Sequence, residues 1–401
     1  MAKIHFFTQL NYKIAIFFAL PTIICNFAYK FSKMYLTKLS LINFKNLAQE
    51  ELSFEKGINC FVGDNGTCKT NIVDAVYYLS MCKSSLAMSD IQCTRHGEPF
   101  FVLDGEYHHD EGRKEQITCT YQRGAQKVLK RNGKAYERLA DHIGLIPVVV
   151  VSPADSSLIS DSADERRRYL NAFISQLDRG YMEAAMRYNS TLAMRNSYLK
   201  TGSDEAMLAI YDQQLCAPAN TIYNARKAII EEMIPLVREY YRALSDDHEQ
   251  VELSYRSELN KASLEELLLA SRERDRVLSF TSCGVHRDDM SFTIGGYMLR
   301  KYGSQGQQKS FLVALKLAQY AIIARRCGEK PILLLDDLFD RLDESRVKRL
   351  ISLVSGEDFG QIIITDCNEE RMRSILDRTN CNYKLFNVTY GTIIKEQDEK
   401  N

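Results

Sequence analysis

The residues that suggest chemistry begin with the loop Gly63-Asp64-Asn65-Gly66-Thr67-Cys68-Lys69-Thr70, which follows a short apolar run and precedes a helical pattern. Such a loop turns successive backbone N–H groups toward a phosphate, and the start of the next helix adds its positive end. We expect Lys69 to be catalytic by reaching the β and γ phosphates of ATP, and the Thr70 hydroxyl to hold Mg²⁺. The eight residues together are the predicted nucleotide loop.

Cys68 stands where this kind of loop usually has a glycine. If the backbone needs a positive φ there, cysteine adds strain and crowding beside the phosphates. If the backbone is helical instead, a small side chain is tolerated and binding stays almost normal. We expect weakened but real ATP binding, tighter binding after Cys68→Gly, and protection of the Cys68 thiol from alkylation by bound Mg-ATP.

Two adjacent carboxylates end the apolar run Ile332-Leu333-Leu334-Leu335. A buried strand with this ending places one acid on Mg²⁺ and another beside the attacking water. We assign Asp336 to the metal and Asp337 to the water, in place of the usual glutamate base. An acidic turn after a strand explains one aspartate well and two adjacent ones poorly.

A second possible anion site is Gly303-Ser304-Gln305-Gly306-Gln307-Gln308, which opens a helical pattern that runs through Ala324. Ser304, Gly306 and Gln307 would cap the γ-phosphate of a nucleotide held by the first loop of another copy. An ordinary capped helix is the alternative. The order of the three motifs is that of ABC ATPases, and Asp340-Arg341-Leu342-Asp343 falls where their D-loop crosses the dimer interface.

The elements that must position these residues read as strands, then helices, then strands. A long helical pattern occupies residues 164–279, and Asn132-Gly133 marks a hairpin. The class is α/β, with a mixed sheet that carries the motifs. The predicted strands are Tyr35 to Phe44, Gly57 to Val62, Phe100 to Tyr107, Gln116 to Tyr121, Ile332 to Leu335 and Ile362 to Ile364, and a helix is predicted over Asn71 to Leu79.

Composition narrows the possible classes of protein. Of the 401 residues, 45% are hydrophobic, and 52 basic residues balance 52 acidic ones, so a nucleic-acid surface must be local. The 11 cysteines include no C-x-x-C pair, which argues against zinc knuckles, zinc hooks and a disulfide scaffold and fits a reducing cytoplasm.

The first 33 residues follow a different pattern. The apolar run from Ile14 to Tyr29, interrupted by Pro21, is similar to a signal peptide or membrane anchor but is short for either role. We interpret residues 1–33 as an extension outside the fold, from a misplaced start, and expect a chain beginning at Met34 to be fully active without a membrane.

A basic hairpin is the candidate DNA surface. Its side chains offer phosphate contacts without an obvious base-reading group. A solvated hairpin is the alternative, and acid pairing within the helix equally explains Arg166-Arg167-Arg168. The candidate DNA-binding residues are Lys127, Lys130, Arg131 and Lys134.

From Met34 nearly to the C-terminus, the sequence resembles the RecF family, bacterial recombination and gap-repair ATPases related to SMC proteins. Two positions depart from the family pattern. Cys68 replaces a glycine, and Val285 stands where the family commonly has proline. Besides the nucleotide motifs, the resemblance includes Ser152-Pro153-Ala154-Asp155, Glu165-Arg166-Arg167-Arg168-Tyr169-Leu170, Arg187-Tyr188-Asn189, Gly284-Val285-His286-Arg287-Asp288-Asp289 and Thr365-Asp366.

The resemblance implies an ABC-type P-loop head without a long coiled coil. Lobe I would combine residues 34–140, which carry the Walker A loop, with residues 281–395, which carry the signature, Walker B and D-loop motifs. Residues 141–280 would form a mainly helical lobe II, followed by a tail at 396–401.

The resemblance also implies a function. A cytoplasmic protein of recombinational gap repair, replication restart and the SOS response would dimerise on ATP and bind double-stranded DNA near single-strand gaps. It would be a weak, DNA-stimulated ATPase that helps RecO and RecR to load RecA. The alternatives are an ATP-binding DNA clamp with little hydrolysis and an ABC transporter ATPase, which would carry a histidine where this chain has Thr365-Asp366.

Overall fold

The computed structural model describes residues 34–202, 204–245, 249–338, 343–379, 382–389 and 392–395. Three predictions fall outside these residues: the extension 1–33, the tail 396–401, and the part of the D-loop formed by Asp340, Arg341 and Leu342. Within the described part of the chain, no helix is both long enough and apolar enough to cross a membrane.

The central sheet has the strand order β15-β14-β3-β13-β12-β8. Every neighbouring pair is parallel except β14 with β15. The predicted apolar strands are confirmed here, because a parallel sheet covered on both faces favours continuous apolar runs. The strands are β3 (Ile58–Val62), β8 (Val148–Val151), β12 (Ile332–Leu335), β13 (Ile362–Asp366), β14 (Tyr383–Thr389) and β15 (Thr392–Lys395).

A second sheet is antiparallel, in the order β2-β1-β4-β5-β6-β7. Its strands alternate buried and exposed positions, because one face packs on α2 (Lys69–Met81). The predicted hairpin is confirmed, with positive φ at both Asn132 and Gly133. The strands are β1 (Met34–Phe44), β2 (Leu47–Ser53), β4 (Phe100–His109), β5 (Lys114–Gln122), β6 (Val128–Arg131) and β7 (Lys134–Ala135).

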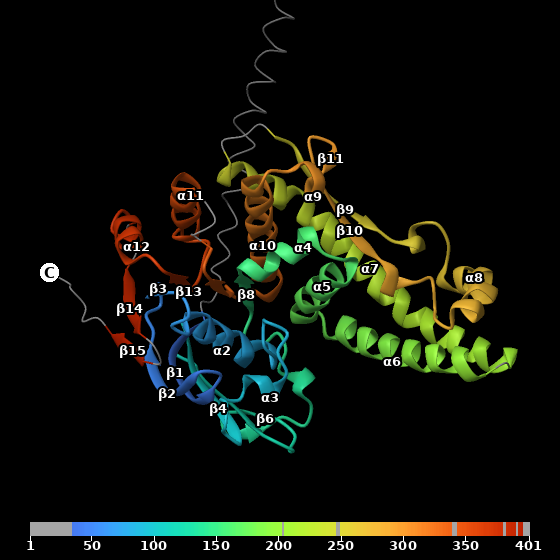
Figure 1. The fold of residues 1–401 in the computed structure, drawn as a ribbon, viewed down its shortest axis with the longest axis horizontal. Helices are drawn as coiled ribbons and strands as arrows, with labels where there is room; N and C mark the ends of the chain where they lie inside the picture. The colour runs from blue at the N-terminus through green and yellow to red at the C-terminus, as the bar shows by residue number, and fades with distance from the viewer. Residues whose placement is uncertain are drawn as a thin grey trace, which may run out of the picture.

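The helical lobe extends to the right of the central sheet in Figure 1. Long helices pack side by side, with α7 against both α6 and α10, while a three-stranded sheet β11-β10-β9 covers them. The elements are α4 (Ser157–Ser160), α5 (Ala163–Leu177), α6 (Arg179–Thr201), α7 (Glu205–Leu244), α8 (Leu264–Leu278), β9 (Val251–Arg256), β10 (Asp289–Ile294) and β11 (Tyr297–Met298).

The sheets cross both predicted lobe boundaries. Strand β8 lies inside the segment 141–280 but pairs with β12 in the central sheet, and β10 lies after residue 280 but pairs with β9. A division that respects the pairing leaves β8 with lobe I and β10 with lobe II. We therefore propose boundaries after β8 and after β11.

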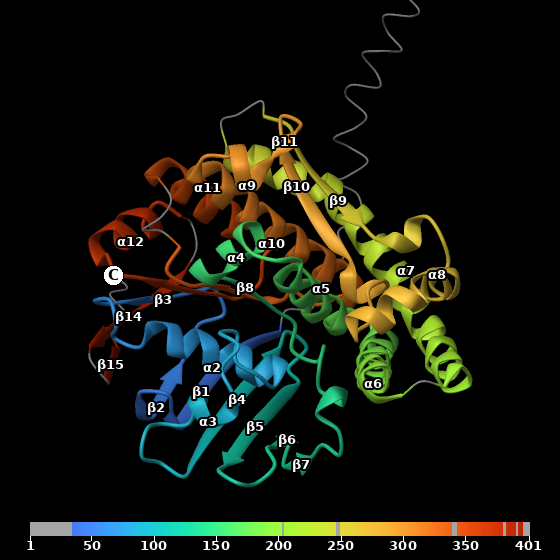
Figure 2. The same ribbon diagram turned by 45° about the vertical axis from the view of Figure 1, so that its right-hand side comes forward.

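Helices lie on both faces of the central sheet. Figures 1 and 2 place α2 on one side of this sheet and α9 with α10 on the other. The helices not yet given are α3 (Asp90–Cys93), α9 (Leu299–Tyr302), α10 (Gln305–Cys327), α11 (Glu344–Val354) and α12 (Glu369–Leu376), and the 3-10 helices are η1 (Leu139–Asp141), η2 (Pro153–Ser156), η3 (Glu258–Asn260) and η4 (Val285–Arg287).

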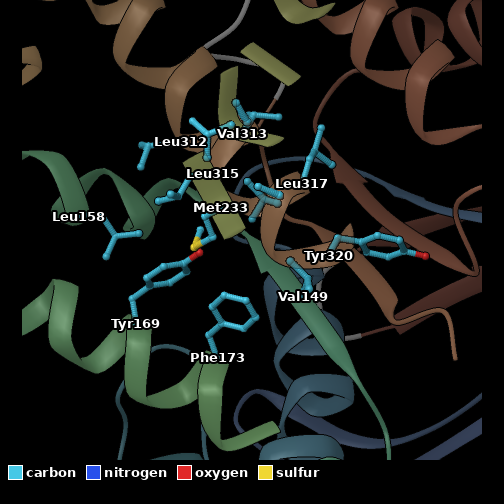
Figure 3. Close-up of a cluster of buried hydrophobic side chains, with 14 of the residues drawn as sticks. Val149, Leu158, Tyr169, Phe173, Met233, Leu312, Val313, Leu315, Leu317 and Tyr320 are labelled. Carbon is cyan, nitrogen blue, oxygen red and sulfur yellow. The ribbon is translucent and has the colours of Figure 1, made fainter. Parts of the chain in front are cut away.

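One hydrophobic cluster joins the helical lobe to the central sheet (Figure 3). Phe173 of α5, Met233 of α7 and Leu315 of α10 meet there beside Val149 of β8. All four side chains are buried, so each removes apolar surface from water at the junction. This packing fixes α10, which begins with the predicted signature motif, against the sheet that carries the carboxylates.

Candidate nucleotide site

The loop after β3 is held by backbone contacts from strands far along the chain. The Gly63 N–H donates to the Asp366 carbonyl at 3.3 Å, and a β-carbon added at Gly63 would lie 2.1 Å from the Val388 carbonyl oxygen. Only glycine permits this close approach, because any side chain would collide with backbone atoms. The first glycine of the predicted loop is therefore required by packing.

Lys69 lies folded over the loop that it follows. Its Nζ donates to the carbonyl oxygens of Gly63, at 2.6 Å, and Asp64, at 2.8 Å, and the residue is only 6% exposed. The Thr67 hydroxyl donates to the Asp64 carbonyl at 2.7 Å and closes the loop further. The structure thus places the lysine ammonium inside the loop, at the start of α2, where the helix dipole favours an anion.

Thr70, Asp336 and Thr365 form one hydrogen-bonded group between β12 and α2. The Thr70 hydroxyl donates to Asp336 Oδ1 at 3.1 Å, and the Thr365 hydroxyl donates to the same oxygen at 2.7 Å. Thr365 also accepts the N–H of Asp337 at 2.9 Å. The two predicted metal ligands therefore lie in direct contact, and the second aspartate is tied to them through one hydroxyl.

Burial controls the charge of this group. Asp336 is 3% exposed, and burial raises the pKa of its carboxyl, while the hydrogen bonds from Thr365 and Thr70 lower it. The described residues contain no cluster of three histidine, cysteine or acidic side chains around a metal position. Mg²⁺ fits such a sparse set of oxygen ligands, because it usually keeps several waters and completes its shell with substrate phosphates.

Cys68 adopts the left-handed conformation, with φ 79° and ψ 11°, as the N-cap of α2. The alternative of a helical backbone at this position is therefore wrong, and the cost of a β-carbon at positive φ applies. The residue is only 9% exposed and belongs to the apolar cluster that includes Ile72 and Val76. Because the side chain packs into this cluster, bound nucleotide has little exposed thiol to protect, and the predicted alkylation test loses its basis.

Ser304 is the N-cap of α10. Within one chain, its contacts are those of an ordinary capped helix, which was the alternative to an anion site. Its hydroxyl accepts the Gln307 N–H at 3.2 Å, while the Gln307 side chain accepts the Ser304 N–H at 2.5 Å. Ser304 itself is exposed, and α9 just before it lies across the central sheet from α2. One chain therefore does not bring the signature motif to its own phosphate loop.

The neighbourhood of the motif leaves limited room for its other two residues. A β-carbon at Gly306 would lie 2.2 Å from Arg346 Nη1, and the Gln307 amide donates to Glu249. The guanidinium can swing aside, since it is the end of a flexible side chain. Because the Gln307 amide donates to Glu249, the groups that the start of α10 offers to an anion are the Ser304 hydroxyl and backbone N–H groups.

Two of the four predicted DNA-binding cations are paired with acidic residues, and the other two are exposed. Lys127 is 11% exposed at its side chain, and its Nζ contacts Asp90 at 3.0 Å and the Cys82 carbonyl at 2.7 Å. Arg131 donates to both oxygens of Glu115 at 2.5 Å. Because Lys127 is held inside the fold, its prediction as a DNA contact is corrected. Lys130 and Lys134 are exposed.

Thr365 is the site residue that the sequence reasoning did not assign. It is the penultimate residue of β13, whose carboxyl end lies at the same edge of the central sheet as those of β3 and β12. A hydroxyl at the end of an apolar strand next to two motif strands was a usable signal, because parallel strands present their carboxyl ends together.

The central parallel sheet, the phosphate-type loop and the paired carboxylates define an ABC-type P-loop ATPase head. The family model for the RecF/RecN/SMC N-terminal domain matches residues 35–393. A solved SMC head shares the fold only: the Smc head domain from Pyrococcus furiosus matches with a TM-score of 0.53 at 16% identity, over 90% of this chain and 95% of that one.

The curated relatives are more specific. The DNA replication and repair protein RecF of Bacteroides thetaiotaomicron is 46% identical over 362 residues, covering 90% of this chain and 98% of the relative. RecF of Flavobacterium johnsoniae is 44% identical, covering 88% and 100%. A solved RecF–ATP structure of the RecFOR pathway matches with a TM-score of 0.81 at 30% identity, over 91% and 98%. The chain belongs to the RecF family.

Proposed function

We propose that this chain is an ATP-dependent DNA repair ATPase of the RecF type, whose active sites are completed by dimerisation. The observation that carries the proposal is the contact between Thr70 and Asp336, which joins the phosphate loop to the carboxylate strand. Solved RecF structures with ATP support ATP as the ligand. Mg²⁺ would be held by Thr70 and Asp336 and would neutralise charge on the phosphates.

The residues of the site divide the work of hydrolysis. Lys69 leaves the loop carbonyls for the β and γ phosphates, and Asp337 orients or deprotonates the attacking water. The Asp337 backbone has φ 47°, and its N–H is anchored by the Thr365 hydroxyl. A carboxylate on a backbone anchored beside Asp336 suits the role of a water-positioning base.

A second copy would supply the missing cap. The exposed Ser304 and the N–H groups at the start of α10 would form an anion-binding helix end, and α10 lies across the central sheet from α2 of the same chain. Head-to-tail pairing of two chains would bring each Ser304 to the γ-phosphate held by the other. ATP then acts as the bridge of the dimer.

Double-stranded DNA at single-strand gaps is the proposed target, with RecO and RecR as partners in loading RecA. Support comes from the family, because a solved relative is described as a recombination mediator of the RecFOR pathway. The exposed Lys130 and Lys134 supply sequence-independent phosphate contacts. Cytoplasmic action follows from this proposal, and the transporter alternative has no support from the family.

Dimerisation is tested at Ser304 with two variants that both keep the helix cap. Asparagine and aspartate cap helices about as well as serine, but only aspartate adds a negative charge opposite the γ-phosphate. Light scattering with ATP should give dimers for the parent and Ser304→Asn and monomers for Ser304→Asp. Equal dimerisation of both variants would exclude the composite site.

Hydrolysis is tested separately from binding. Phosphate release is measured for the parent and Asp337→Asn, each with and without gapped duplex DNA. An ATPase shows DNA-stimulated release that Asp337→Asn reduces by about 100-fold, the usual scale for a positioned base. ATP-dependent dimers with no release in either protein would instead establish the clamp with little hydrolysis.

A further inference from the structure

A basic hollow lies in the helical lobe, separate from the nucleotide site. It has a volume of about 410 Å³ between α5, α6, α7 and residues 280–287. This volume is within the range of small-ligand sites, about 300 to 1,000 Å³. The charged groups in its wall are four cations and one acid: Arg167, Arg168, Arg226, Arg287 and Asp164.

Two of these arginines serve mainly to build the wall. Arg226 is buried and uses three of its nitrogens, donating to Tyr181, Val285, Asp288 and Asn171. Arg167 donates to the Asp288 carbonyl at 2.7 Å and pairs with Asp164. Arg168 pairs with Glu165 at 2.5 Å, so three of the four arginines in the wall have an acidic partner, and Arg287 is the cation left to meet a ligand.

Arg287 is differently placed. It is exposed, its guanidinium lies over the Phe280 ring at 5.1 Å, and within the described part of the chain that guanidinium donates one long hydrogen bond, 3.4 Å to the Thr281 carbonyl. No contact of the described residues joins it to a carboxylate. Stacking on an aromatic ring orients the flat guanidinium while leaving its N–H groups for a ligand.

The segment that carries Arg287 is packed rigidly. Gly284 has φ 113°, and a β-carbon there would lie 2.7 Å from the Tyr188 hydroxyl. That hydroxyl donates to His286 Nδ1 at 2.8 Å, because His286 Nε2–H donates to the Thr281 carbonyl at 3.0 Å. The 3-10 turn η4 is therefore fixed from both sides, and Arg287 is presented by a preorganised backbone.

The electrostatics of the hollow affect its histidine. Burial, with smaller contributions from the nearby Arg287 and Arg167, lowers the pKa of His286 to about 4 against the opposing bond to Thr281. His286 is thus neutral at pH 7, with both ring nitrogens occupied. It holds the turn in place, and Arg287 supplies the unpaired positive charge.

We propose that this hollow is a second phosphate site, which binds a phosphoryl group through the guanidinium of Arg287. The planar fork of a guanidinium matches the oxygens of a phosphate and can donate two hydrogen bonds to them. The phosphoryl group comes from a DNA backbone or from a free phosphorylated compound. The site is independent of ATP hydrolysis at the first loop.

The test uses inorganic pyrophosphate as the probe and the Lys69→Ala variant, which removes the phosphate contact of the first loop. Calorimetry on this variant should give one pyrophosphate per chain. Adding Arg287→Gln should weaken binding by at least roughly tenfold, the effect of losing one charge-assisted contact. The added Arg287→Lys should restore part of it.

The matched control adds Arg325→Gln, which removes an exposed arginine of α10 outside the hollow. Competition by a short duplex assigns the phosphoryl group to DNA, and its failure assigns it to a free compound. Equal pyrophosphate binding after Arg287→Gln and Arg325→Gln would overturn the proposal, as would no binding to the Lys69→Ala variant. Either result leaves dimerisation at Ser304 untouched.

Discussion

The hydroxyl of Thr70 lies 3.1 Å from a carboxylate oxygen of Asp336, although 266 residues separate them in the chain. This contact aligns the start of α2 with the end of β12, so the two oxygen ligands proposed for Mg²⁺ are already adjacent. A cation that enters here need not reorganise the backbone, and such preorganisation favours binding.

The first prediction removes that contact. Thr70→Val keeps the shape of the side chain but loses the hydroxyl, and we expect ATP hydrolysis to fall about 100-fold, as loss of a metal ligand costs several kcal/mol. Thr70→Ser, which retains the hydroxyl, should stay within a few fold of the parent. Phosphate release at saturating Mg-ATP is the measurement. Similar rates for the valine and serine variants would contradict the metal role.

The second prediction concerns the left-handed backbone at Cys68. Both Cys68→Gly and Cys68→Ala delete the buried sulfur, but only glycine adopts φ 79° without a β-carbon penalty. We expect the glycine variant to be more stable than the alanine variant by roughly 1 kcal/mol in urea unfolding, and to bind ATP more tightly. Equal stability of the two variants would show that the loop is not strained.

The third prediction separates the hairpin cations. Neutralising Lys130 and Lys134 to glutamine should reduce the slope of log affinity for duplex DNA against log salt by about 2, because each phosphate contact contributes about 0.9. Fluorescence anisotropy at several salt concentrations measures this slope.

Lys127→Gln is the matched contrast on the same hairpin. It should leave the salt slope unchanged but destabilise the fold by roughly 1 to 3 kcal/mol, since Asp90 loses its partly buried partner. A large change of slope for Lys127→Gln, or none for the exposed pair, would move the DNA surface elsewhere.

The fourth prediction concerns pH and His142, whose Nε2–H donates to the Leu79 carbonyl at 2.7 Å. Burial lowers the pKa of His142 from 6.5 to about 4. Between these two pH values, His142 is protonated in the unfolded chain but not in the folded chain. The free energy of unfolding therefore falls as pH drops from about 6.5 to about 4. The loss from this group approaches roughly 3 kcal/mol at the lower end.

Urea unfolding at pH 7 and pH 5 checks this prediction against the variant His142→Gln, which cannot titrate. The variant should lose less stability between the two pH values than the parent does, whatever its stability at pH 7. A parent and variant with the same pH dependence would show that His142 does not carry the effect.

Much of the site was predictable because each motif is local in sequence. The phosphate loop and the strand from Ile332 to Leu335 are read from neighbouring residues, and the Asn132-Gly133 turn has a strong local preference. The hairpin cations were less predictable, because Asp90, which pairs with Lys127, comes from another element. Thr365 gains its role only through the order of strands, which no local pattern specifies.

The predicted lobe boundaries differ from those that the strand pairing favours, for a related reason. Strand β8 is short, and its four valines are typical of any buried strand, so nothing local indicates that it joins β12. Pairing between strands distant in sequence is decided by the whole sheet.

The place of β3 has a consequence for synthesis of the chain on the ribosome. Its two neighbours in the central sheet are β13 and β14, which begin at Ile362 and Tyr383. While the nascent chain is shorter than this, the phosphate loop follows a strand with two open hydrogen-bonding edges, which are prone to wrong pairing. We therefore expect nucleotide affinity to arise only near the end of translation and to be absent from a chain terminated before β13.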